Sequence, residues 1–179
     1  MQALFLDKSL LIIFQLSSYV LQHNMGTLSI SGQRYIMHIA QTQQSINIWL
    51  MKKQQQVDIE LKPTCAPQFL RIADQMGLKT RFRRGCLAGT AYCIISPKGK
   101  VQPCAYLNME LGDVRQTPFD EIWKNSPVLN KLRTMEYSGG CGSCQYKRAC
   151  GGCRARAAYY HEGDYMAEEP WCLYHGRKG

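Results

Sequence analysis

The sequence predicts an α+β fold in which the end of a partial α/β barrel is followed by a small cysteine-rich domain with a β-hairpin and short helices. Two observations lead to it. Residues 45–77 read as helix, strand, loop and helix, the order of one unit of an α/β barrel. All nine cysteines lie from Cys65 onward. We therefore divide the chain into residues 1–44, which we leave unassigned, a barrel unit over 45–80 and a cysteine-rich domain over 81–179.

The first 44 residues carry no recognisable chemistry. Residues 4–21 are apolar enough to suggest a signal peptide or a membrane anchor, but Asp7 and Lys8 interrupt them. The charge-free part is shorter than the ~20 residues that span a bilayer, and no small-residue cleavage site follows. We favour a buried helix or strand here, and hence a cytoplasmic protein with no membrane partner. Residues 25–39 alternate weakly, which predicts a short hairpin.

The barrel unit is expected from three consecutive patterns. Residues 45–56 have apolar side chains at helical spacing and a polar end, which predicts an amphipathic helix. Residues 57–61 (VDIEL) alternate as a strand does. Residues 67–77 begin with proline and end with Gly77, which predicts a second helix.

Short elements between cysteines are expected after Gly77. Residues 93–104 contain two short apolar runs around a Pro-Lys-Gly-Lys turn, a hairpin pattern in which Gly99 supplies positive φ. Residues 117–135 predict two helices, with Thr117 as the N-cap of the first and Ser126 preceding the second. We expect a loop over residues 141–153 and a helix over 154–160.

The loop over residues 141–153 reads CGSCQYKRACGGC and contains two Cys-x-x-Cys pairs. Two cysteines at this spacing can bend around one metal atom, with the backbone of the turn donating to their sulfur atoms. Gly142, Gly151 and Gly152 suit such turns, because a side chain would crowd the backbone and the metal. The pairs therefore predict a metal site.

Eight of the nine cysteines can be divided into two sites of four ligands. Cys86, Cys93 and Cys104 flank the predicted hairpin, and Cys172 follows the paired cysteines. Eight thiolates suit either two iron–sulfur clusters or two zinc ions, and the count alone does not choose between them. Disulfides or buried apolar cysteines are the remaining interpretation, which is weak for a chain without a convincing export signal.

The spacing of these eight cysteines, with Gly99 before Cys104, resembles the SPASM domain found at the C-terminus of many radical-SAM enzymes. The resemblance covers about half of the chain. It departs at Gly151-Gly152, where SPASM domains commonly have three residues. Four stretches are more specific and are similar to radical-SAM proteins of alternative haem biosynthesis, a group that includes an Fe-coproporphyrin III decarboxylase, a didecarboxysiroheme deacetylase and a nitrite-reductase haem protein: RGCLAGTAYCIISPKGKVQPCAYL, FDEIWKNSPVLNKLR, CGGCRARA and GDYMAEEPWC.

The resemblance implies one or two [4Fe–4S] clusters with defined ligands. The first cluster would be held by Cys86, Cys93, Cys104 and Cys153. The second would be held by Cys141, Cys144, Cys150 and Cys172. The two sets interlock along the chain, so the clusters would join the hairpin to the C-terminal loop.

The resemblance also implies a catalytic core and partners that this sequence does not supply. A radical-SAM enzyme binds S-adenosylmethionine on a further [4Fe–4S] cluster held by Cys-x-x-x-Cys-x-x-Cys, and no such spacing occurs here. We therefore expect this chain not to cleave S-adenosylmethionine alone, as a fragment or as one part of a split enzyme whose core is on a separate chain. The complete enzyme would act on a tetrapyrrole and take electrons from a donor protein.

Cys65 falls outside the eight. At the C-terminal end of a barrel strand it would face the substrate cavity, where α/β barrels place their chemistry. It is then a catalytic candidate, as a substrate-side donor or as an extra ligand. Equally, it could be a small buried apolar residue, since cysteine is among the most buried residue types.

The formal net charge of +9 suggests an anionic partner. A zinc module that contacts nucleic acid is the main alternative function, but the chain lacks a recognition-helix pattern and we expect no nucleic-acid partner. A secreted disulfide protein would require the N-terminal run to be a signal. The basic segment 154–161, with Arg81, Arg83 and Arg84, could bind porphyrin propionates or form a solvated face.

Overall fold

A computed structural model describes residues 30–174, so the predictions for the apolar run 4–21 and for the start of the 25–39 hairpin lie outside the described residues. The three strands of a small antiparallel sheet follow one another in the sequence, with helices before and after them, which confirms the α+β class. The elements are α2 (Ile30–Gln54), α3 (Phe69–Gln75), β1 (Ile94–Ile95), β2 (Lys100–Gln102), β3 (Gly112–Asp113), α4 (Phe119–Asn125), α5 (Pro127–Thr134), α6 (Gly139–Gly142) and α7 (Arg154–Tyr160).

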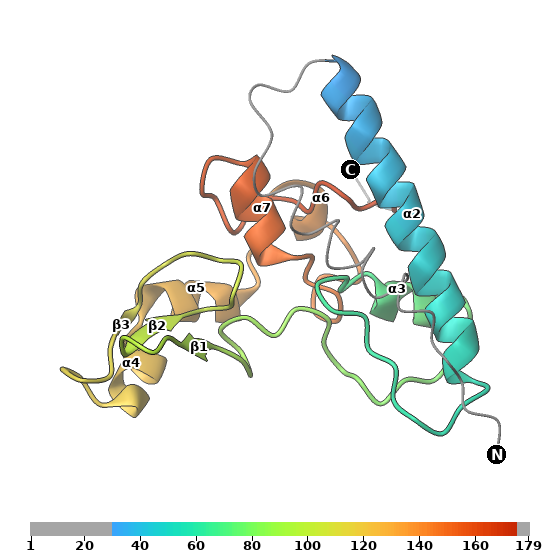
Figure 1. The fold of residues 1–179 in the computed structure, drawn as a ribbon. Coiled ribbons are helices and arrows are strands. Elements are labelled where there is room, and N and C mark those ends of the chain that lie inside the picture. The colour runs from blue at the N-terminus through green and yellow to red at the C-terminus, as the bar shows by residue number, and fades with distance from the viewer. Residues whose placement is uncertain (1–29, 175–179) are drawn as a thin grey trace.

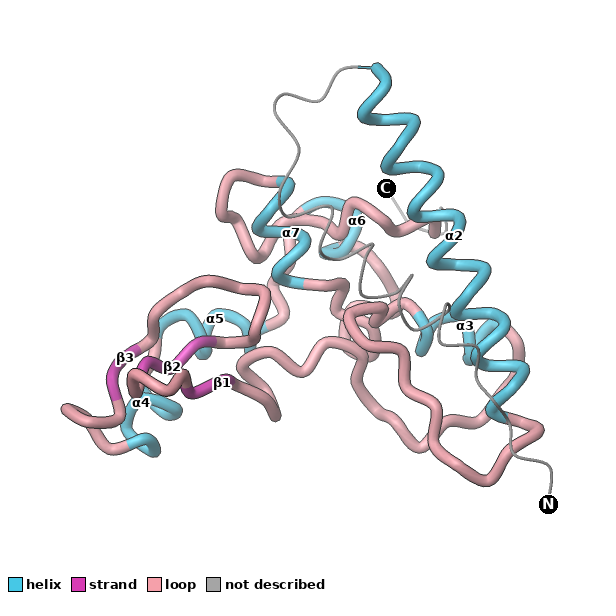
Figure 2. The backbone as a smooth tube through the Cα atoms, in the orientation of Figure 1, coloured by secondary structure: helices cyan, strands magenta, loops and turns pink. Residues whose placement is uncertain are grey.

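The elements form two groups with the cysteine-bearing segments between them. Figure 1 shows α2 and α3 on one side and the three-stranded sheet with α4 and α5 on the other. The short helices α6 and α7 lie between these groups. Figure 2 shows that loops make up most of the chain around them. No large sheet or helix bundle is present among the described residues to stabilise this irregular backbone, so other interactions must do so.

Helix α2 replaces the hairpin predicted for residues 25–39 wherever the structure describes that range, and it also covers the helix predicted over 45–56. Its buried positions are Ala40, Gln43, Asn47 and Met51, which follow helical spacing. Two of these four are polar, so hydrophobic periodicity alone does not reveal the buried face. No helix among residues 30–174 is both long and apolar enough to cross a membrane.

The strand predicted over residues 57–61 is wrong, because this segment is a loop. Strands exist by pairing, and no neighbouring strand lies beside it in the described chain. The side chain of Gln54 at the end of α2 binds its backbone instead: the amide nitrogen donates to the carbonyl of Ile59, and the amide oxygen accepts from the N–H of Leu61. The partial barrel itself stays a prediction.

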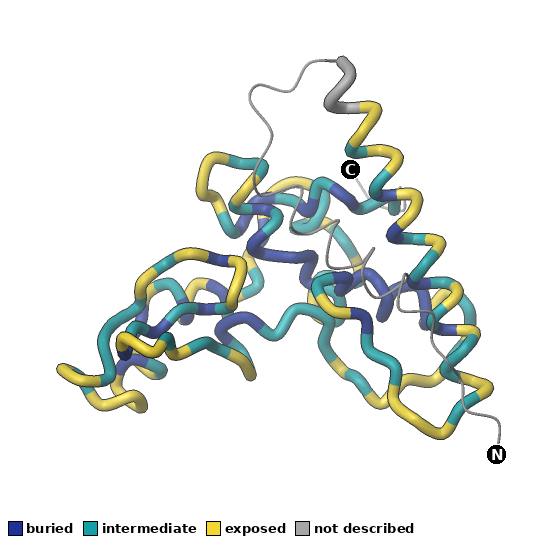
Figure 3. Tube along the Cα trace, in the orientation of Figure 1, coloured by how far each residue is buried: buried dark blue, intermediate teal, exposed yellow. Residues whose placement is uncertain are grey.

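Helix α3 forms where residues 67–77 predicted a helix, and it ends at Gln75, just before the predicted stop Gly77, which has φ +66°. Its Phe69 and Ile72 pack with Met51 of α2 in a buried cluster. Figure 3 shows dark blue backbone at this contact, in the segments around α7 and in the sheet with α4 and α5. The described core is therefore split into small parts, and the cysteine-bearing segments lie among them.

The predicted hairpin is confirmed. Strands β1 and β2 pair antiparallel, with Ile95 opposite Val101, and Gly99 in the turn has φ +78°. Strand β3 was not predicted, and it pairs with β2 as Lys100 opposite Asp113. The backbone N–H of Arg115 and the Lys100 ammonium lower the pKa of the Asp113 carboxyl.

The two predicted helices after the sheet are present. The N-cap of α4 is Pro118 rather than Thr117, because Pro118 has a non-helical ψ of 138°. Helix α5 starts as predicted, with the Ser126 hydroxyl accepting a hydrogen bond from the N–H of Leu129. Helix α7 matches its predicted range. The loop predicted over residues 141–153 is largely correct, although the four-residue helix α6 enters it.

Candidate metal centre

Cys141, Cys144, Cys150 and Cys172 line one pocket. These are the four cysteines expected to form the second ligand set. They come from α6, the loop after it and the segment that follows α7. The structure therefore brings together residues that are up to 31 positions apart, counted from Cys141 to Cys172.

The two glycines inside the second Cys-x-x-Cys pair both have positive φ, and Gly152 also lacks space for a side chain. Gly152 has φ +59°, and an added Cβ would lie 2.4 Å from Nη2 of Arg154 and 2.8 Å from Cβ of Glu169. Gly151 has φ +71°. Both residues therefore need glycine, for conformation and, at Gly152, also for space. This agrees with the role predicted for these glycines.

Backbone N–H groups donate hydrogen bonds to the sulfur atoms of two cysteines in this pocket. The N–H of Tyr146 donates to Sγ of Cys144 at 3.4 Å, and the N–H of Glu169 donates to Sγ of Cys141 at 3.3 Å. Burial raises the pKa of Cys150, and the N–H of Gly152 opposes that shift. Such donors stabilise negative charge on sulfur, so the pocket is arranged to hold thiolates once their protons are lost.

The first predicted ligand set is brought together only in part. Cys86, Cys104 and Cys153 line a cavity of about 310 Å³, and Cys65 lines it with them. Cys93 is not among the residues that line this cavity. Its assignment as a ligand stays a prediction, and the structure adds Cys65 to the residues to be considered.

The cysteines around this larger cavity differ in their surroundings. Burial raises the pKa of Cys86, with an opposing backbone N–H from Ala88 two residues on. Burial raises the pKa of Cys104 to about 11, again opposed by a backbone N–H two residues on. The neighbouring Cys153 thiol and burial both raise the pKa of Cys65.

The two cysteine groups adjoin through the backbone. The N–H of Cys86 donates to the carbonyl of Cys150 at 3.2 Å, and the N–H of Gly85 donates to that of Ala149 at 2.8 Å. A Cβ on Gly85 would lie 2.8 Å from the Cys150 carbonyl oxygen. The segment before the hairpin and the C-terminal loop are thus joined directly, as the interlocked ligand sets would require.

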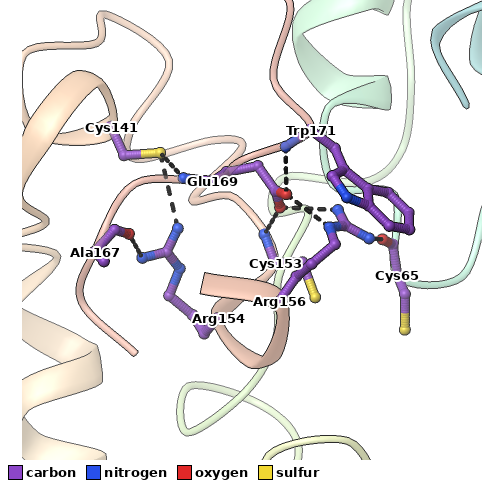
Figure 4. Close-up of polar contacts among 8 residues, drawn as sticks. All are labelled: Cys65, Cys141, Cys153, Arg154, Arg156, Ala167, Glu169 and Trp171. Atoms are coloured by element: carbon purple, nitrogen blue, oxygen red, sulfur yellow. Dashed lines mark hydrogen bonds and ion pairs between the residues drawn. The ribbon is translucent and has the colours of Figure 1, made fainter. Parts of the chain in front are cut away.

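A buried ion pair holds the segments between the two groups (Figure 4). Arg156 of α7 binds Glu169 through Nε at 2.6 Å and Nη2 at 2.8 Å. Glu169 also accepts the backbone N–H of Cys153 at 2.5 Å and that of Trp171 at 3.2 Å. The Arg156 guanidinium lies 4.1 Å from the centre of the Trp171 ring. One carboxylate therefore positions the backbone beside Cys153 and that just before Cys172.

Arg154 is buried in the same region, with 1% of its surface exposed. Its Nη1 donates to the carbonyl of Ala167 at 2.7 Å, and its Nη2 approaches Sγ of Cys141 at 3.8 Å (Figure 4). Its guanidinium lies 4.3 Å from the centre of the Tyr137 ring. The solvated face considered for residues 154–161 is therefore wrong for Arg154, which is buried, and for Arg156, whose side chain is only 10% exposed.

The donor set suits an iron–sulfur cluster. All nine cysteines are free thiols. Gln68 lines the pocket of Cys141, is 4% exposed, and both polar atoms of its side chain lack a hydrogen-bond partner among residues 30–174. A buried amide without a partner is costly, and a cluster sulfide or thiolate would accept its N–H. In the same part of the chain, no three His, Cys, Asp or Glu side chains form a group that could hold a metal ion.

Comparison with known families explains this arrangement. Residues 86–154 match the SPASM family, an iron–sulfur cluster-binding domain. This match assigns residues 86–154 to the SPASM domain family. The match includes seven of the eight predicted ligands, since only Cys172 lies beyond it. The expected resemblance is therefore confirmed.

The proteins similar to this chain include heme synthases. The chain is 43% identical over 157 residues to an AdoMet-dependent heme synthase of Nitratidesulfovibrio vulgaris, which covers 80% of this chain and 42% of that protein. It is 45% identical over 139 residues to the enzyme of the same name from Methanosarcina barkeri, covering 70% and 40%. The mycofactocin maturase MftC of Mycobacterium ulcerans is 39% identical over 93 residues, covering 49% and 25%. The chain thus spans about two fifths of the heme synthases, and no solved structure matches it.

Two residues of the site were not found from the sequence. Glu169 is an acidic residue three positions before Cys172 in a basic chain, and this was the signal that could have indicated it. Gln68 gave no signal, because a glutamine at the start of a helix is ordinary. Glu169 and Gln68 belong to the site only because segments that are distant in the sequence meet at the cysteines.

Proposed function

We propose that this SPASM domain binds two [4Fe–4S] clusters and serves as the auxiliary-cluster domain of a radical-SAM enzyme of haem or tetrapyrrole synthesis. The observation that carries this proposal is the pocket lined by Cys141, Cys144, Cys150 and Cys172, with backbone N–H groups directed at its sulfur atoms. The larger cavity lined by Cys86, Cys104 and Cys153 supports a second cluster.

The tetrapyrrole part of the proposal rests on the heme synthases, to which the chain is 43% and 45% identical. We place the S-adenosylmethionine-binding core outside these 179 residues, on a longer or a separate chain, so that the SPASM domain alone is inactive. In the assembled enzyme an electron-donor protein would exchange electrons with this domain, and the tetrapyrrole would bind between it and the core.

The protein's own groups prepare the site for this role. The cysteines lose their protons to solvent on binding iron, and the N–H groups of Tyr146 and Glu169 stabilise the resulting negative charge. Arg154 adds a positive charge beside Cys141, which favours the more negative, reduced state of the site. Bound clusters would supply one-electron transfer at low potential.

Anaerobic reconstitution of the whole chain with iron and sulfide tests the proposal. We expect about eight irons, about eight labile sulfides and the ~400 nm absorption of thiolate-held clusters. About four irons would support one cluster instead of two. Zinc bound at stoichiometric amount without sulfide would overturn the proposal.

A pair of neighbouring variants makes the test specific. Cys144→Ala removes a predicted ligand and should lower the iron content by about half. Ser143→Ala changes an exposed residue inside the same Cys-x-x-Cys turn and should leave the iron content unchanged. Equal iron in both variants would contradict the assignment of this pocket.

A further inference from the structure

The thiol of Cys65 lies among three predicted ligands of the first cluster. Cys65, Cys86, Cys104 and Cys153 all line the cavity of about 310 Å³. In Figure 4 the sulfur atoms of Cys65 and Cys153 point to the same side, away from the carboxylate of Glu169. Four thiols around one cavity make the donor set of a [4Fe–4S] cluster.

The backbone at Cys65 is held in an uncommon conformation. Its φ is +54°, in the left-handed region that residues other than glycine seldom occupy. Nη1 of Arg156 donates to the Cys65 carbonyl at 3.0 Å, while the same guanidinium is bound by Glu169. Such a conformation persists only where the surrounding structure enforces it, and it is common at functional sites. The ion pair that positions Cys153 therefore positions Cys65 as well.

Cys93 has a different environment. It does not line the cavity, although its neighbours in the hairpin segment, Tyr92 and Cys104, do. It directly precedes β1, whose pairing with β2 limits how far this residue can move. Ligation by Cys93 would require the backbone there to shift, whereas Cys65 is already in place.

We infer that Cys65 is the fourth ligand of the first cluster, together with Cys86, Cys104 and Cys153, and that Cys93 is not a ligand. This inference rests on the proposed binding of iron–sulfur clusters. On ligation, the Cys65 thiol would release its proton to solvent and form an iron–sulfur bond. The cluster would then tie the loop before α3 to the SPASM domain, since Cys65 lies outside the matched residues 86–154.

Matched alanine variants of the whole chain test this assignment. After anaerobic reconstitution and removal of loose iron with a chelator, we expect about eight irons in the wild-type chain and in Cys93→Ala. We expect about four in Cys65→Ala, whose remaining cluster shows that the Cys141 pocket is still folded. Cys65→Ser, with an oxygen ligand, should retain more iron than Cys65→Ala and change the electron paramagnetic resonance signal of one cluster.

Several results would overturn the inference. Full iron content and an unchanged resonance signal in Cys65→Ala would leave Cys65 as a substrate-side donor or a buried apolar residue. Loss of half the iron in Cys93→Ala would show that Cys93 is the ligand. Absence of iron and sulfide from the wild-type chain would instead refute the proposed function itself, so the two failures are distinguishable.

Discussion

Replacing Glu169 with glutamine should destabilise the chain strongly. The carboxylate of Glu169 is 2% exposed and accepts two hydrogen bonds from Arg156 and one backbone N–H each from Cys153 and Trp171. Glutamine keeps the shape but removes the charge, and its NH₂ group faces N–H donors. Removing one partner of a buried ion pair typically costs about 3–5 kcal/mol, because the other charge stays buried without a partner.

The assay is urea unfolding of the metal-free chain in reductant, followed by far-ultraviolet circular dichroism, so that cluster loss does not enter the measurement. With a slope of about 2 kcal/mol per M for a chain of this size, a loss of about 4 kcal/mol lowers the urea midpoint by about 2 M. The control is Asp120→Asn, which breaks the exposed pair with Lys124 at 3.3 Å and should cost less than about 1 kcal/mol.

A double variant separates the unpaired charge from other effects. Arg156→Met removes the positive charge, so adding it to Glu169→Gln should cost less than the sum of the two single changes. A midpoint shift below about 0.5 M for Glu169→Gln, or additive costs in the double variant, would refute the reasoning that this pair is buried and coupled.

Three further predictions concern separate parts of the molecule. Arg154→Lys loses the guanidinium contact to Cys141 and should lower the reduction potential of the cluster in that pocket. A redox titration followed by electron paramagnetic resonance measures this potential, and an unchanged value would contradict the prediction. Asp113→Asn should lower the free energy of unfolding at pH 7. The difference should vanish as the pH falls below about 4, through the lowered pKa of Asp113, because this carboxyl stabilises the fold only while it is ionised. A difference independent of pH would count against the prediction. Gly77→Ala should lower the free energy of unfolding in urea by about 1–2 kcal/mol, because the residue has φ +66°. Gly152→Ala should lower it clearly more, because the added Cβ also meets other atoms. Equal losses in the two variants would contradict this prediction.

Local chemistry explains the parts of the fold that the sequence predicted. Gly99 and the turn around it determine the hairpin, Gly77 ends α3, and Ser126 caps α5, each through interactions within a few residues. The spacing of the paired cysteines likewise predicted a metal pocket, because Cys-x-x-Cys turns are local structures.

Tertiary contacts explain the parts that the sequence did not predict. Helix α2 buries Gln43 and Asn47, so its pattern did not show the buried face, and residues 57–61 form a loop because no strand pairs with them. These outcomes depend on what lies beside each segment.

The sequence by itself indicated the class of site, because its spaced cysteines and glycines resemble a SPASM domain, and the match over residues 86–154 agrees with that resemblance. Only the tertiary structure placed Cys65 beside Cys153 and buried Arg154, Arg156 and Glu169 between the two cysteine groups. Charged residues read from a sequence look solvated, because exposure is their usual state. A buried ion pair exists only where segments distant along the chain exclude water from both partners.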